Sequence, residues 1–208
     1  MKTISVISQK GGAGKTTLAI HLAVAVQEAG NDVVIVDLDP QASATSWKDL
    51  RSDEAPVVVS AQAARLKQIL AAAAERDVHI AIIDTAPHSE SAALAAARNS
   101  DLVLIPCRPA ILDLKAIGTT IDLVKLAGTP AFILLNAVPP RGSLGEDARA
   151  AVESYNIPVA PVQLDHRAAY VHALTVGKAA QEYEPDSKAA EEVRHVYTWT
   201  CKQVKLKT

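Results

Sequence analysis

The segment Lys10-Gly11-Gly12-Ala13-Gly14-Lys15-Thr16-Thr17 decides the fold, because it holds three of the nine glycines of the chain within four residues. It follows a β-branched run at residues 3–8 and opens an alanine-rich segment of helical period at residues 16–29. Glycines at such a turn let successive backbone N–H groups face inward as an anion site, and the helix N-terminus adds partial positive charge. The segment therefore predicts a phosphate-binding loop between a strand and a helix.

The side chains of this loop are suited to a polyphosphate bound with magnesium. Lys15 is expected to reach the β- and γ-phosphates, Thr16 to ligate Mg²⁺ through its hydroxyl group, and Thr17 to donate to the α-phosphate. The residues expected to bind the nucleotide are Gly11, Gly12, Ala13, Gly14, Lys15, Thr16 and Thr17.

Outside the loop, short β-branched runs alternate with alanine-rich segments of helical length. The expected strands are residues 3–8, 32–36, 57–59, 78–83, 102–105, 131–135 and, with a weaker signal, 157–162. The expected helices are residues 16–29, 61–74, 91–99, 111–127, 143–154, 167–176 and 186–205. Because the strands are apolar nearly end to end, they are expected to be buried on both faces. The pattern predicts an α/β fold with a doubly wound, mainly parallel sheet flanked by helices, and the short run 57–59 is suited to an edge.

The composition indicates one soluble globular domain over residues 1–208. Hydrophobic residues make up 49% of the chain, yet no stretch reaches the about 18 consecutive apolar residues of a membrane span. The net charge of −2 means that attraction to nucleic acid has to come from a local patch, and 3% aromatic residues disfavour binding by base stacking. Cys107 and Cys201 lie far apart without a close partner, which excludes metal-ligand spacing and fits a reduced, cytoplasmic setting.

Three motifs in order carry a resemblance to a known family. The strict pattern G-x-x-x-x-G-K-[ST] fails at its first position, which is Gln9, and a second lysine follows as Lys10. This arrangement resembles the deviant Walker A loop of the ParA/MinD family of ATPases. The segment Asp37-Leu38-Asp39-Pro40-Gln41 looks like switch I of that family, and Ile82-Ile83-Asp84-Thr85-Ala86-Pro87 looks like its Walker B and switch II. The resemblance runs from residue 1 to about residue 176, and it is to the short form without an N-terminal helix-turn-helix.

The resemblance implies an ATPase that uses ATP/ADP and Mg²⁺ and dimerises with ATP. Lys15 is expected to serve the nucleotide of its own chain, so Lys10 is expected to act in trans at the partner's nucleotide, as an arginine finger does. The active site would then be complete only in a face-to-face dimer.

Four further polar residues are expected at the site. Asp84 ends a buried strand and is suited to hold Mg²⁺ directly or through water, with a strand-end cap as the alternative. By resemblance, Asp39 orients the attacking water, Asp37 lies in the outer shell of the metal, and Asn136 recognises adenine with backbone groups of residues 158–163. A helix or turn cap is the alternative for Asp37, and a turn-forming role is the alternative for Asn136.

The last helical segment carries a basic face. No acidic side chain follows Glu192, and the remaining sixteen residues carry a charge of +4. Apolar positions at helical spacing are expected to dock this helix on the protein body. They are Val193, Val196, Tyr197, Thr200, Cys201 and Val204. The cations expected to contact DNA are Arg194, Lys202, Lys205 and Lys207, with Arg167 and Lys178 as further candidates. A solvated face without a partner is the alternative for each of them.

By resemblance, the protein is expected to be a partition ATPase that binds nonspecific DNA as the ATP dimer and positions plasmid or chromosome cargo. Its adaptor would be a centromere-binding protein of the ParB kind or a small ribbon-helix-helix protein, and the ATPase would be cytoplasmic, on the nucleoid. Carriers of bacterial microcompartments use nearly the same ATPase, so the identity of the cargo stays open.

Three other functions fit the sequence less well. A MinD-like lipid anchor needs exposed apolar side chains beside its cations, and only Trp199 and Leu206 remain once the docking face is assigned, so no membrane partner is expected. A metabolic enzyme similar to the dethiobiotin synthetase relatives would need substrate-binding residues in loops that are almost all short. A cluster-bridging iron protein similar to that of nitrogenase would need two cysteines near the dimer axis, and Cys201 belongs to the last helix.

Overall fold

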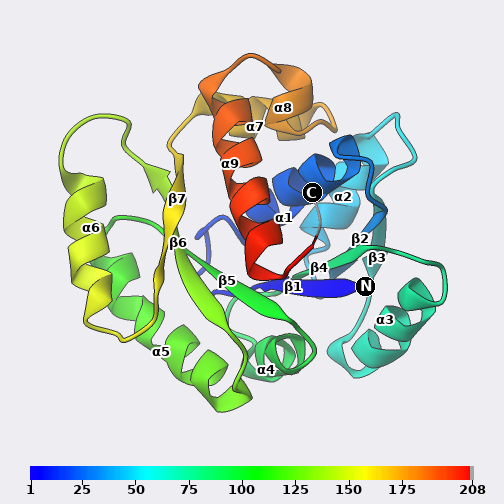
Figure 1. The fold of residues 1–208 in the computed structure, drawn as a ribbon, viewed down its shortest axis with the longest axis horizontal. Coiled ribbons are helices and arrows are strands. Elements are labelled where there is room, and N and C mark those ends of the chain that lie inside the picture. The colour runs from blue at the N-terminus through cyan, green and yellow to red at the C-terminus, as the bar shows by residue number, and fades with distance from the viewer. Residues whose placement is uncertain (207–208) are drawn as a thin grey trace.

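A computed structural model describes residues 1–206, and it contains a seven-stranded sheet between two layers of helices (Figure 1). The strand order is β3-β2-β4-β1-β5-β6-β7, and every neighbouring pair is parallel. The strands are β1 Lys2–Val6, β2 Val33–Asp37, β3 Val57–Ser60, β4 Ile80–Asp84, β5 Leu102–Cys107, β6 Ala131–Val138 and β7 Val159–Asp165. All seven predicted strands are present, β3 lies at the edge as expected, and the doubly wound α/β fold is confirmed.

The helices form one layer on each face of the sheet (Figure 1). The first layer packs on the core that contains α1 and α9, and its helices are α1 Lys15–Glu28, α2 Ser43–Leu50, α7 Ala168–Thr175, α8 Ala180–Tyr183 and α9 Lys188–Gln203. The second layer consists of α3 Leu66–Ala74, α4 Glu90–Arg98, α5 Ile111–Ala127 and α6 Leu144–Glu153, with a 3₁₀ turn at Ala63–Arg65 before α3. Two of these helices, α2 and α8, were not predicted from the sequence.

The central strands explain why the sheet needs both layers. In β4, Ile80 and Ile82 face the first core while Ala81 and Ile83 face the second, and all four are fully buried. A strand that is apolar on both sides leaves no face for water, so helices have to cover it above and below. The strand order reverses at β1, which lies between β4 and β5. Ligands of open α/β sheets bind in the crevice at such a point, beyond the carboxyl ends of the strands.

Helix α9 docks as predicted, with one exception. The six apolar positions that the spacing assigned to docking are all buried. Trp199 is buried as well, and its ring lies edge-to-face against Phe132 with centroids 5.0 Å apart. The prediction that Trp199 is available beside the cations is therefore wrong, because this side of α9 also packs on the sheet, against Phe132 of β6. Cys107 and Cys201 are both buried free thiols. No helix among the described residues combines the length and apolar character that crossing a bilayer requires.

Candidate nucleotide-binding site

The glycine-rich loop lies between β1 and α1, at the point where the strand order reverses. Gly12 and Gly14 have φ angles of +74° and +91°, which side chains rarely adopt. A Cβ atom on Gly14 would lie 2.1 Å from the Asn136 Nδ2 atom, so this position has no room for a side chain. Glycine is thus required here by the backbone angle and by the close approach of Asn136.

Asn136 holds the loop against the sheet. It belongs to β6 and is buried, and its Nδ2 donates a hydrogen bond to the Ala13 carbonyl oxygen over 2.7 Å. Its Oδ1 accepts from the Ala137 N–H at 2.9 Å. Both ends of the amide are therefore engaged within the chain, which gives Asn136 a role in positioning the loop. Its recognition of adenine stays a prediction.

Thr16 and Asp84 meet beside the glycine-rich loop. The Thr16 hydroxyl donates to Asp84 Oδ2 over 2.6 Å, and Asp84 Oδ1 is buried without a hydrogen-bond partner among residues 1–206. Burial raises the pKa of Asp84 to about 7, although the Thr16 hydrogen bond lowers it, and neighbouring Asp37 raises it further. A buried carboxylate with a bare oxygen is stabilised by a cation. These two side chains therefore fit a magnesium ion held together with nucleotide phosphates.

Lys15 points into the same region. Its side chain is buried, and its Nζ donates to the Lys10 carbonyl oxygen over 3.3 Å. Burial lowers the pKa of Lys15, while the charges of Asp84 and Asp39 raise it. An ammonium group inside a loop of backbone amides is suited to offset phosphate charge, and the contact of Lys15 with a nucleotide stays a prediction. No group of three or more His, Cys, Asp or Glu side chains in the described part of the chain could hold a metal by itself.

Switch I is organised by the carboxylate of Asp37. Its Oδ1 accepts from the Asp39 N–H at 3.0 Å, and its Oδ2 accepts from the N–H groups of Ala44 and Thr45 at 3.1 and 3.2 Å. Asp37 therefore caps the first turn of α2, the alternative that the sequence left open. It also lies opposite Asp84 in the register of β2 and β4, so the cap and the metal site are neighbours. Asp39 is half-buried, and its Oδ1 accepts from the Gln41 N–H.

Lys10 lies apart from the cradle of its own loop. Its Nζ is 3.7 Å from Asp113 Oδ1 in the first turn of α5, and its side chain is 44% exposed. A lysine held at the rim of the loop and open to solvent can reach a neighbouring molecule. The geometry is compatible with action in trans, which stays a prediction. Asp113 as its partner was missed by the sequence reasoning, since the two residues share no local pattern.

A cavity of about 1080 Å³ opens beside the nucleotide site, between the two switch segments. Asp39 and Gln41 line it from switch I, and Pro87 and Ser89 line it from the segment after β4. Arg65 contributes a cation from the turn before α3. The cavity gives a ligand or a partner segment direct access to Asp39.

The model of the CobQ/CobB/MinD/ParA nucleotide binding domain matches residues 4–175. The chain belongs to this family. "Maintenance of carboxysome distribution protein A" of Gloeobacter kilaueensis is 34% identical over 205 residues, covering 92% of this chain and 94% of that protein. "Sporulation initiation inhibitor protein Soj" of Bacillus subtilis is 27% identical over 98% of both chains. The structure of the septum site-determining protein MinD of Pyrococcus horikoshii, complexed with Mg-ADP, superposes with a TM-score of 0.80 at 20% identity, over 97% of this chain and 96% of that one.

Membership of the CobQ/CobB/MinD/ParA family confirms the predicted resemblance, and nucleotide binding is the property that names this domain. The structure brings Lys15, Thr16 and Asp84 into one cluster, with Asp37 and Asp39 beside it. The motif-based predictions thus describe a single site at the carboxyl edge of the central strands.

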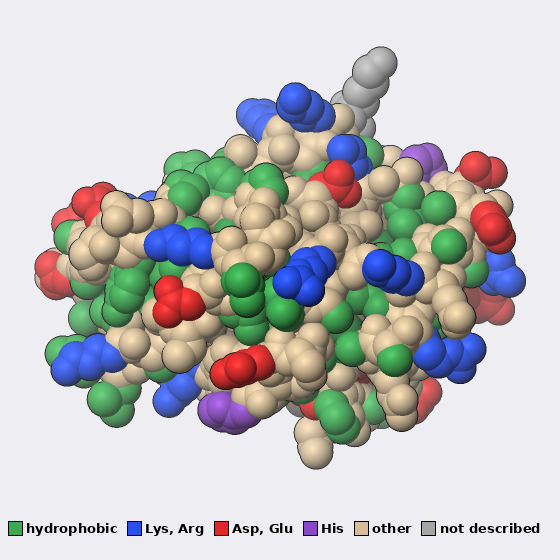
Figure 2. Space-filling model, turned by 90° about the horizontal axis from the view of Figure 1, so that it is seen from below, with side chains coloured by type: hydrophobic (Ala, Val, Ile, Leu, Met, Phe, Trp, Pro, Cys, Tyr) green, Lys and Arg blue, Asp and Glu red, His purple; other side chains and the backbone are tan. Residues whose placement is uncertain are grey.

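The cations predicted to contact DNA differ from one another in their exposure and in their contacts. Lys178, Lys202 and Lys205 are exposed. Arg194 is exposed too, but it donates to the Pro185 carbonyl oxygen at 2.7 Å. Figure 2 shows Lys and Arg side chains spread over the face that it draws, with Asp and Glu side chains among them. Lys207 lies outside the described residues.

Arg167 differs from the other predicted DNA contacts. It is paired with Asp165 at 2.9 Å and with Glu192, and its side chain is only 22% exposed. Two carboxylates balance its charge, so its placement does not support the predicted contact with DNA. The sequence revealed the cation but not its pairing with Glu192, which is 25 positions away.

Proposed function

We propose that this protein is an ATPase that positions a carboxysome-like microcompartment, with nonspecific DNA as the track. The observation that carries the proposal is the similarity to the carboxysome distribution protein, which extends over more than nine tenths of both chains at 34% identity. The similarity to the "Chromosome partitioning protein ParA" of Caulobacter vibrioides, at 33% identity, covers only 53% of this chain. The likeness to a distribution protein therefore favours a protein-walled cargo over a DNA cargo.

In the proposed reaction, the loop amides and Lys15 bind the ATP phosphates, while Thr16 and Asp84 hold Mg²⁺. Asp39 orients the attacking water, and Lys10 of a second copy completes the site from across a dimer interface. Each of these groups neutralises or positions charge in the transition state, which is how phosphoryl transfer is accelerated. ATP thereby links dimer formation to hydrolysis.

DNA binding is proposed to use the exposed cations Lys178, Arg194, Lys202 and Lys205. A single chain with a net charge of −2 offers few phosphate contacts. Dimerisation doubles their number, and each added contact multiplies the affinity at low salt. DNA binding would therefore follow the nucleotide state.

DNA partition is the second candidate, because the chain is also 33% identical to the chromosome partitioning protein of Caulobacter vibrioides. In that case, the adaptor would be a ParB-like or ribbon-helix-helix protein.

Deletion of the gene in its host separates the two candidates, with microcompartment shells and a chromosomal or plasmid locus labelled in the same cells. Clustered or unevenly inherited compartments with normal DNA inheritance are expected. Loss of plasmid or chromosome segregation with normal compartments, or a host without such compartments, would overturn the main proposal in favour of partition.

A further inference from the structure

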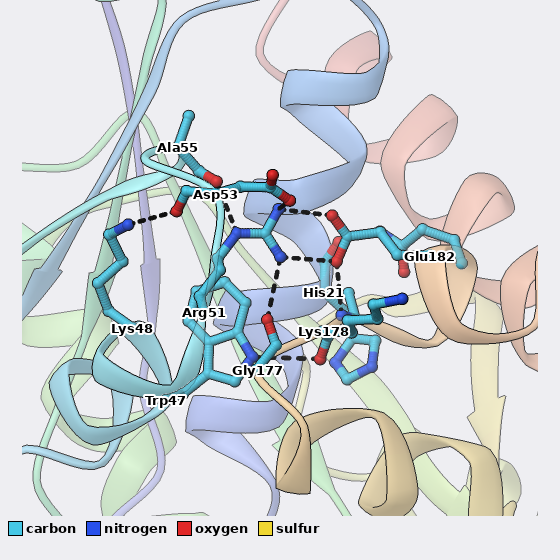
Figure 3. A network of polar contacts seen from close by, with 11 residues as sticks. His21, Trp47, Lys48, Arg51, Asp53, Ala55, Gly177, Lys178 and Glu182 are labelled. Atoms are coloured by element: carbon cyan, nitrogen blue, oxygen red, sulfur yellow. Dashed lines mark hydrogen bonds and ion pairs between the residues drawn. The ribbon is translucent and has the colours of Figure 1, made fainter.

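Helix α2 joins the nucleotide switch to a distant segment through a buried polar network (Figure 3). This segment, the 177–182 loop, comprises the connection before α8 and the first three residues of α8. The N-terminal end of α2 is held by Asp37, directly beside the metal site. Its C-terminal end carries Trp47 and reaches Arg51, the residue that follows the helix. The eight residues of α2 form a rigid span of about 12 Å between these two ends.

Arg51 is the centre of this network. Its side chain is only 2% exposed, and it forms a bidentate ion pair with Glu182, the third residue of α8. It also donates to the carbonyl oxygens of Ala55 at 2.6 Å and Gly177 at 3.1 Å. Burial alone would raise the pKa of Glu182, but the hydrogen bonds from Arg51 and the Ala179 N–H hold it below its usual value. A buried charge pair with this many partners is costly to break from one side.

Two more contacts fix the same junction. The Trp47 indole N–H donates to the Lys178 carbonyl oxygen at 3.1 Å, and the Arg51 guanidinium lies 5.1 Å from the centre of the Trp47 ring. Gly177 has a φ angle of +69°, and a Cβ there would lie 2.5 Å from the Leu50 backbone. The end of α2 and the 177–182 loop therefore touch backbone to backbone, and neither can move far without the other.

We propose that α2 and this clip, formed by Trp47, Arg51, Gly177, Lys178 and Glu182, mechanically link switch I to the 177–182 loop. The inference rests on the proposed ATPase function, because the input is a rearrangement of Asp37 and Asp39 around the nucleotide and metal. The output is the position of the loop that carries Lys178 and leads into α8. Such coupling is reciprocal, so a ligand that binds at this loop also alters the nucleotide site.

Amide hydrogen exchange tests the link, with the full chain in the presence of Mg²⁺ and either a non-hydrolysable ATP analogue or no nucleotide. In the parent protein, the analogue is expected to change exchange at least about fivefold in three segments, residues 9–17, 38–46 and 177–184. In Trp47→Phe, and in Arg51→Met combined with Glu182→Met, the change at 177–184 is expected to fall below about twofold while the change at 9–17 persists. The double variant replaces the buried pair by apolar side chains, which avoids leaving one charge buried without its partner.

Lys48→Ala is the matched control on the same helix, because it removes only the bond to the Asp53 carbonyl oxygen and should respond like the parent. A parent response at 9–17 without one at 177–184 would overturn the link and leave the ATPase proposal standing. Clip variants that keep the parent response at residues 177–184 would also overturn the link and leave the ATPase proposal standing. Absence of any response at 9–17 would overturn both.

Discussion

Replacing Gly14 by Ala tests whether Asn136 and the loop form one unit. The new Cβ atom would lie 2.1 Å from Asn136 Nδ2, so the amide has to leave the Ala13 carbonyl oxygen. The left-handed backbone costs about 1–2 kcal/mol for a non-glycine residue, and a buried carbonyl without its partner costs about 1–3 kcal/mol. Gly14→Ala is therefore expected to reduce the free energy of unfolding by about 2–5 kcal/mol.

The double variant makes this reasoning refutable. Asn136→Ala alone loses the same hydrogen bond and should cost about 1–3 kcal/mol. Gly14→Ala combined with Asn136→Ala loses the bond to the Ala13 carbonyl oxygen only once, so its cost should fall about 1–3 kcal/mol short of the sum of the two single effects. The assay is urea unfolding of the nucleotide-free protein, followed by tryptophan fluorescence and circular dichroism. Additivity of the two single effects within about 0.5 kcal/mol would refute the shared contact.

Four other predictions follow from the site and the surface. Asp84→Asn should weaken Mg²⁺-dependent nucleotide binding at least about tenfold, measured by calorimetry. It should also raise the melting temperature at pH 8, because it removes a buried carboxylate whose pKa is raised to about 7, and a lower melting temperature would contradict this. In the Asp84→Asn variant, the free energy of unfolding should fall by about 3 kcal/mol from pH 6.5 to 4, since burial lowers the pKa of His21 to about 4 and only the unfolded chain takes up the proton in that range. Adding His21→Asn should abolish this fall, and an unchanged pH dependence of the free energy of unfolding would exclude His21 as its cause. Asp39→Ala should bind ATP like the parent but release phosphate at least about tenfold more slowly, because it no longer positions the water; unchanged turnover would remove Asp39 from the mechanism. Lys202→Ala with Lys205→Ala should weaken DNA binding and flatten its salt dependence without changing ATP affinity; parental affinity and slope would place the DNA surface elsewhere.

The phosphate loop was predictable because its chemistry is local. Three glycines, two lysines and two threonines in eight residues predict both the positive φ angles of the loop and a phosphate ligand. Each predicted strand appears within three residues of its expected bounds, because a strand buried on both faces leaves a continuous apolar run. The pairing of Thr16 with Asp84 followed from motif order, since both lie at the carboxyl edge of neighbouring strands.

Features that depend on distant partners were not predictable. Helix α2 buries only Ala44 and Trp47, which is too few apolar positions to reveal a helical period, and the cap by Asp37 and the clip hold it in place. Arg51 and Glu182 are 131 positions apart, and nothing local marks them as a pair. The exposed position predicted for Trp199 was wrong for the same reason, since Phe132 covers it from another part of the chain.

Retention on DNA in the presence of Mg²⁺ with ATP or with ADP tests most directly whether the chain is a nucleotide-switched positioning ATPase. The parent protein should be held on nonspecific DNA with ATP and released with ADP, and Lys10→Ala should bind ATP but lose retention because the dimer site stays incomplete. Equal retention with both nucleotides, or parental retention by Lys10→Ala, would contradict the account.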